Sequence, residues 1–110
     1  MRVDTLTVGV AQEVTVGAAQ AITVGANQDL NVGINRSTSI GKEDELTVGK
    51  KLTITAGDEI TFKTGEASIT MKKDGTIIIK GKDITIQGSG KITGKADKDM
   101  VLKAQKILQN

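Results

Sequence analysis

The sequence contains no Cys, His, Pro, Trp or Tyr, and Phe62 is its only aromatic residue. Without cysteine, the chain has no disulfide framework and no thiolate metal site. Without histidine, it lacks the commonest general base and the commonest metal ligand. Aromatic side chains usually supply much of the area buried in a compact core. The 110 residues are therefore predicted to form a thin core repeated many times rather than one thick core.

Charge and hydropathy exclude further classes of protein. Fifteen Lys and Arg stand against thirteen Asp and Glu, so the formal net charge is +2, which is not the basic footprint of a nucleic-acid-binding protein. Stacking on bases also needs aromatic side chains. No apolar run approaches the roughly 20 residues that span a bilayer, and the N-terminus has no signal-peptide pattern. We expect neither nucleic-acid binding nor a transmembrane helix.

An eight-residue repeat runs through the first half of the sequence. Units such as Ile22-Thr23-Val24-Gly25 alternate apolar and polar residues before a glycine, which is typical of a short strand with one buried face. Glycine can adopt a positive φ, so we expect the chain to turn sharply there. The predicted corners, eight residues apart, are Gly9, Gly17, Gly25, Gly33, Gly41, Gly49, Gly57 and Gly65.

The alternation also predicts which side chains share the inner face of each strand. The positions one and three residues before each glycine are mostly aliphatic. With the later alternating isoleucines, they give a predicted core of Leu6, Val8, Val14, Val16, Ile22, Val24, Leu30, Val32, Leu46, Val48, Ile54, Ile77, Ile79, Ile84 and Ile86.

The position five residues before each glycine has the same parity but is mostly polar. Two interpretations stay open for it. Its side chains reach solvent at a corner, or they form an internal ladder in which Arg36 and Asp44 of adjacent layers pair, as buried charges require. Thr38 and Ser39 also interrupt the aliphatic series nearby.

Units this short cannot be stable singly, because each buries few side chains and leaves both strand edges open. Stacking pairs the edges, either in a single-chain solenoid or in three chains that wind together, with one octad from each chain per triangular layer. A solenoid would show a superperiod of two or three octads, and none is visible. The predicted fold class is therefore all-β: a triple-stranded, intertwined, trimeric β-helix (prism) with glycine corners.

The repeat loosens toward the C-terminus. We predict an octad-repeat needle over residues 1–95, regular over 1–66 and less regular over 67–95, where Lys73-Asp74-Gly75 suggests a turn or an insertion. Residues 96–110 fit strand alternation or helical spacing, with strand favoured, and form the end of the needle. The predicted docking residues for a partner there are Ile107 and Leu108.

The phrases LTVG at 6–9 and 46–49, VTVG at 14–17 and ITVG at 22–25 resemble the C-terminal β-helix, or needle, of the VgrG (valine–glycine repeat) spike proteins of type VI secretion systems. The run from 67 to 92 is similar to the end of that needle. The resemblance covers most of the chain. A more distant similarity is to the needles of contractile phage tails.

The VgrG resemblance implies a structural part of a secretion tip complex rather than an enzyme. The expected assembly is a rigid homotrimeric rod that punctures membranes and carries a PAAR-repeat tip protein on its C-terminal end. The resemblance also implies a secretion tube below an N-terminal body, which we expect this chain to lack. The resemblance implies assembly in the bacterial cytoplasm, followed by secretion outside the cell or into a target cell.

Other classes remain as alternatives: a phage-type tail-spike or adhesin, a carbohydrate-active β-helix enzyme, and a single-chain β-solenoid scaffold. Glycan binding usually uses exposed Trp or Tyr, and hydrolysis uses a persistent carboxylate pair; the sequence has no Trp or Tyr and its acids fall at scattered offsets. We predict no catalytic, cofactor-binding or metal-binding residue, and read Asp83, Asp97 and Asp99 as surface acids.

Overall fold

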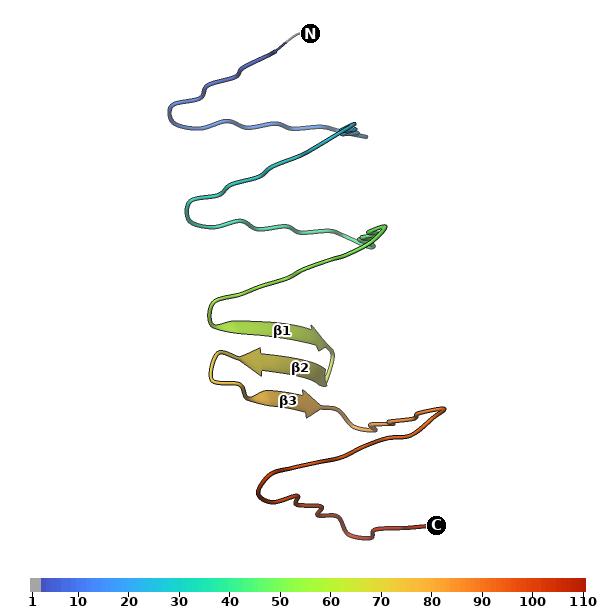
Figure 1. Cartoon of the computed structure of the whole chain (residues 1–110). Coiled ribbons are helices and arrows are strands. Elements are labelled where there is room, and N and C mark those ends of the chain that lie inside the picture. The colour runs from blue at the N-terminus through green and yellow to red at the C-terminus, as the bar shows by residue number, and fades with distance from the viewer. Residues whose placement is uncertain (1–2) are drawn as a thin grey trace. The chain divides into compact units, whose positions relative to one another are not determined.

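The structure is a computed structural model that describes residues 3–110. The first two residues of the predicted repeat region 1–95 lie outside the described residues. Across the described part, the regular secondary structure is all β without a helix, which confirms the all-β character of the prediction. The strands are β1 (Glu59–Thr64), β2 (Ala67–Lys72) and β3 (Ile77–Lys80) (Figure 1). The chain divides into two units, Met1–Leu46 and Thr47–Asn110.

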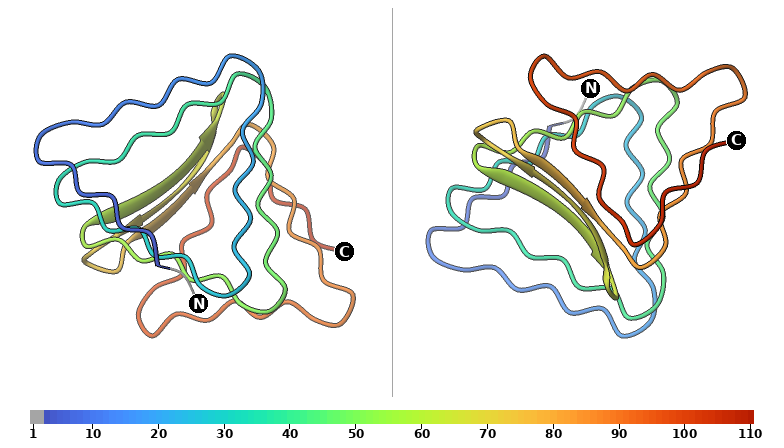
Figure 2. Two further views of the ribbon diagram at one scale, coloured as in Figure 1. Left: turned by 90° about the horizontal axis from the view of Figure 1, so that it is seen from above. Right: turned by 90° about the horizontal axis from the view of Figure 1, so that it is seen from below.

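The N-terminal unit is an extended chain that changes direction every eight residues. It bends at residues 9–10, 17–18, 25–26, 33–34 and 41–42, so a predicted corner glycine begins each bend. Viewed from above, the segments between bends run in three directions in turn (Figure 2). The dark blue segment after the first bend and the teal segment three octads later therefore follow the same side (Figure 2).

The backbone of residues 5–46 in this unit forms no pairing with other described residues. No backbone–backbone hydrogen bond joins any two of the described residues 5–46, and none of them belongs to a strand. Extended segments pair only when they lie about 4.8 Å apart. Because segments on the same side are three octads apart in sequence, the pairing positions beside each segment are left unfilled by this chain.

The octad glycines turn the chain without the backbone conformation that the sequence suggested. Of the eight predicted corners, only Gly65 has a positive φ, of 54°. From Gly9 to Gly57, an added Cβ would meet nothing within 4 Å. The expectation of positive φ at these seven corners is wrong, because each bend is spread over the glycine and the residue that follows it.

The C-terminal unit contains a three-stranded antiparallel sheet of order β1-β2-β3. β1 and β2 pair from Glu59↔Lys72 to Thr64↔Ala67, and β2 and β3 pair from Ser68↔Lys80 to Met71↔Ile77. The β1–β2 loop is only two residues long and contains Gly65, whose positive φ suits a tight hairpin. Gly65 therefore reverses the chain, whereas the sequence pattern presented it as one more corner of a continuing stack.

The rest of this unit is extended chain between bends, at residues 49–50 and 57–58 before the sheet and at 82–83, 89–90, 97–98 and 105 after it. Residues 96–110 contain no helix, so the helical interpretation of that segment is wrong. No backbone–backbone hydrogen bond joins any two of residues 81–110. The self-paired backbone of this unit therefore lies within residues 58–80.

The single chain has no buried core among its described residues. The least exposed of them are only half-buried: Ile60, Ser68, Thr70 and Gly81. Three of these four belong to β1 or β2. The sheet thus provides what little shielding from solvent one chain provides by itself.

Gly65→Ala should destabilise the β1–β2 hairpin by about 1–2 kcal/mol, because an L-residue pays that amount in the left-handed region. Thermal unfolding followed by circular dichroism measures the loss. Gly57→Ala is the matched control, since φ there is not positive and no atom lies within 4 Å of an added Cβ. Equal losses at the two positions would contradict the assigned hairpin geometry.

Candidate functional site: an uncovered apolar surface

Two columns of aliphatic side chains run along the octads and differ in their exposure. The valines just before the bends are between 44 % and 47 % exposed: Val8, Val16, Val24, Val32 and Val48. The residues two positions earlier are between 65 % and 73 % exposed: Leu6, Val14, Ile22, Leu30 and Leu46. The side chains next to each bend are thus less exposed than those two positions earlier. All of these predicted core residues are accessible in the single chain.

The sheet has one apolar face and one polar face. Residues directly opposite each other on paired strands project from the same face. The apolar face contains the rows Ile60–Met71–Ile77 and Phe62–Ile69–Ile79. Phe62 is 54 % exposed, although burying a Phe side chain contributes about 1.5–3 kcal/mol. The single chain therefore leaves this apolar face accessible to solvent.

A groove of about 670 Å³ follows the apolar face and continues past the end of β3. Its apolar lining includes Phe62, Ile69, Ile79 and Ile84. The groove joins the sheet to the extended chain that follows it. The apolar surface thus extends beyond the three strands.

The opposite face of the sheet is mostly polar and charged. Lys63, Ser68 and Lys80 form one cross-strand row, and Glu59 lies opposite Lys72 at the other end of the β1–β2 pair. Thr61 Oγ1 donates a hydrogen bond to Glu59 Oε2 at 3.5 Å. Charged and hydroxyl-bearing side chains are usually found at the surface, so this face is suited to contact with water, although Ser68 and Thr70 are half-buried in the single chain.

The turn between β2 and β3 is held by short hydrogen bonds. Lys72 N donates to Thr76 O at 2.9 Å, and Gly75 N donates to Lys72 O at 3.0 Å. Asp74 Oδ1 accepts a bond from Thr76 N at 3.0 Å, and bonds from Thr76 lower the pKa of this carboxyl below its ordinary value of 3.8. Gly75 has φ of 95°, which favours glycine. The turn chemistry predicted at residues 73–75 is present.

The structure brings together some of the predicted core residues. Ile77 and Ile79 share the apolar face of the sheet with Ile60 and Phe62. The predicted core did not include the residues that β1 and β2 contribute to this face, although period-2 alternation in Ala-Ser-Ile-Thr-Met-Lys marks Ile69 and Met71. The predicted docking residues Ile107 and Leu108 are 62 % and 81 % exposed.

The described residues present no metal cluster of three or more His, Cys, Asp or Glu side chains. Residues 3–110 also include no helix with the length and hydropathy to cross a membrane. No protein-family model matches the chain, and a search of curated proteins finds no match. The uncovered apolar surface, together with unpaired backbone, is thus the feature on which a functional proposal rests.

The bond between Asp74 and Thr76 should make the stability of the β2–β3 turn depend on pH. Because the folded pKa is lowered, the ionised carboxylate stabilises the fold at pH above 3.8. This contribution is lost as the pH falls through the folded pKa. Acid unfolding of the protein and of Asp74→Asn, whose side-chain oxygen still accepts the bond but does not titrate, measures the effect. The same acid-dependent loss in both proteins would contradict it.

Proposed function

We propose that three copies of this chain wind together into a triple-stranded β-helix that serves as a rigid, non-enzymatic rod. The observation that carries the proposal is the coincidence of unpaired backbone with uncovered aliphatic columns in residues 5–46. Leaving backbone groups without partners away from water is costly. A second and a third chain supply hydrogen-bond partners to the strand edges, and their side chains also cover the aliphatic columns.

The winding of the N-terminal unit supports three chains. Its segments take three directions in turn, so one chain returns to a given side only after three octads (Figure 2). Two further chains, related by three-fold symmetry, fill the two intervening positions on each side. A residue of one copy then neighbours the residue eight positions later in the next copy, and strands stack about 4.8 Å apart.

The β1–β3 sheet fits the same scheme in another way. In the octad region, three successive strand positions on one side of the rod are filled by three different chains, with one strand from each chain. In the sheet, one chain supplies all three strands. Three such sheets, each turning its apolar face inward, enclose a continuous core lined by Phe62, Ile69 and Ile79, and keep the lysine-rich face in water.

The biological role that fits such a rod best is the needle of a type VI secretion tip, as the resemblance of the octads to VgrG suggests. Strands hydrogen-bonded along the axis make a stack that resists compression when the needle is driven through a target membrane. The closed sides leave open strand edges mainly at the ends. Residues 96–110 are the proposed platform for a PAAR-type tip protein, with Ile107 and Leu108 as contacts. The homotrimer assembles in the bacterial cytoplasm and is then secreted.

Two alternatives use the same repeat. A single-chain solenoid is disfavoured because its successive coils pair within the chain, whereas strand pairing in the described residues is confined to Glu59–Lys80. A phage-type tail-spike shares the trimeric rod and differs in its partner. Binding to a cell-surface glycan rather than to a tip protein favours that alternative.

Val24→Asp should abolish the trimer, whereas Thr23→Asp should preserve it. Three aliphatic side chains lose burial worth about 1.5–3 kcal/mol each, and three charges enter the core, whereas Thr23 lies on the outward side by alternation. Light-scattering mass reads the outcome: three times 11.5 kDa for the native chain and for Thr23→Asp, and 11.5 kDa for Val24→Asp. A monomeric native chain, or equal effects of the two variants, would overturn the proposal.

Combining Ile107→Asp with Leu108→Asp should leave the trimer mass unchanged and reduce capture of a PAAR-type tip protein by at least about tenfold. Two apolar side chains exposed in the single chain lose a contact worth about 1.5–3 kcal/mol each. Equilibrium binding to the trimer measures the effect. The matched control is the pair Lys103→Asp and Lys106→Asp, which places acids in the same segment; equal losses would remove the assigned role of Ile107 and Leu108.

A further inference from the structure

Most octads of the N-terminal unit are interchangeable. The pairs Leu6/Val8, Val14/Val16, Ile22/Val24 and Leu30/Val32 place similar side chains at equivalent positions. Sliding one chain past its neighbours by a whole octad exchanges one aliphatic pair for another. Register is weakly specified wherever a slip leaves the buried pattern unchanged. The aliphatic columns therefore hold chains together without aligning them along the axis.

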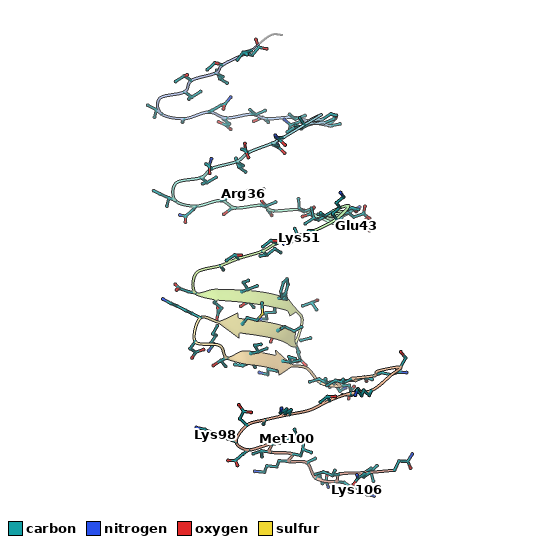
Figure 3. The ribbon with its side chains drawn as sticks, in the orientation of Figure 1. Arg36, Glu43, Lys51, Lys98, Met100 and Lys106 are labelled. Carbon is teal, nitrogen blue, oxygen red and sulfur yellow. The ribbon has the colours of Figure 1, made fainter. Side chains whose placement is uncertain are left out.

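A pair of opposite charges lies in this otherwise repetitive region. Arg36 and Asp44 occupy equivalent positions in two successive octads, three residues after the glycine that begins a bend. Their equivalents are Gln12, Gln20 and Gln28 before them and Leu52 and Ile60 after them. Arg36 lies on the extended segment between the bends at residues 33–34 and 41–42 (Figure 3).

The sheet indicates which face this column occupies. Ile60, the last member, shares the apolar face of the sheet with Phe62 and Met71. Because the bends keep their eight-residue spacing up to residue 57, we assign Arg36 and Asp44 to the inner face as well. Both side chains are exposed in the single chain, and neither forms a hydrogen bond or ion pair with another described residue.

We propose that Arg36 of one copy pairs with Asp44 of the next copy inside the trimer, and that this pair sets the axial register of the three chains. The inference rests on the proposed trimer, in which a residue neighbours the residue eight positions later in the next copy. A shift of one octad would place Arg36 against Arg36 and Asp44 against Asp44. Like charges brought together away from water are strongly unfavourable, so the pair selects one alignment.

The partner is thus a second copy of this chain, recognised by charge. A buried ion pair contributes little net stability compared with well-packed apolar side chains, but removing one member leaves an uncompensated buried charge. The proposal therefore predicts a particular pattern of mutational effects. Each single substitution weakens the trimer strongly, and the double substitution does not.

The test compares the trimer dissociation of the full chain with that of Arg36→Leu, Asp44→Leu and the variant carrying both. Each single change should weaken the trimer by at least about tenfold, and the combined variant should return to within about threefold of the native chain. The control is Asp29→Leu, an outward acid by alternation whose counterpart eight residues later is Ser37, and it should have little effect. Single variants indistinguishable from the control, or a combined variant as weak as the sum of both, would overturn the pairing.

Disulfide cross-linking measures the axial register of the three chains separately. Because the native chain has no cysteine, only introduced cysteines can cross-link. Thr23→Cys combined with Asn31→Cys places thiols on adjacent strands of neighbouring copies and should give a covalent trimer on oxidation, because strand spacing suits a disulfide. Thr23→Cys alone should not cross-link unless a chain slips by one octad. Adding Arg36→Leu and Asp44→Leu to that single-cysteine chain should produce dimers, and their absence would overturn the register role.

These outcomes separate the inference from the proposed function. If the native chain has the mass of a monomer, both the trimer and the pairing are ruled out. If the native chain is a trimer and the single leucine variants behave like Asp29→Leu, the trimer stands and only the pairing is ruled out. If the double substitution restores the trimer but cross-linking is unchanged, the pairing stands and its control of register is ruled out.

Discussion

Backbone hydrogen bonding is the constraint on which the rest of this structure depends. A strand that turns every eight residues and advances around three sides cannot pair with its own chain, because its next pass on the same side comes three octads later (Figure 2). In the proposed trimer, other copies supply hydrogen-bond partners to the backbone groups left open in residues 5–46 as these groups are removed from water. The same arrangement covers the exposed aliphatic columns, so it satisfies both the backbone and the side chains.

The sheet formed by β1, β2 and β3 satisfies its backbone hydrogen bonds in a different way. There the chain reverses at Gly65 and again at residues 73–76, and pairs with itself. Self-pairing leaves only the apolar face and the two outer edges to be covered. The sheet is therefore the part of the chain whose strands pair within one copy, and its apolar face, which includes Phe62, is accessible in the single chain.

The sequence predicted much of this arrangement, and its failures have physical causes. Alternation before each glycine was enough to predict an all-β chain, and the bends begin at the glycines of the repeat. The hairpin at Gly65 was not predicted because that glycine continues the eight-residue series, so spacing alone could not separate a reversal from a corner. The signal lay downstream, in the alternation through Ile69 and Met71 and in Asp74-Gly75. Positive φ was expected at every corner because glycine permits it, but a bend spread over two residues does not require it.

Amide hydrogen exchange tests the central claim most directly, because it reports whether each N–H is hydrogen-bonded in the assembled protein. Within residues 5–46 one chain provides no backbone–backbone hydrogen bond, whereas β1–β3 are paired internally. If three copies supply the missing partners, amides across both regions are protected to a similar degree, and protection in the octads disappears when the trimer dissociates. Octad amides that exchange at the rate of an unfolded chain, beside a protected sheet in the same sample, would contradict the account.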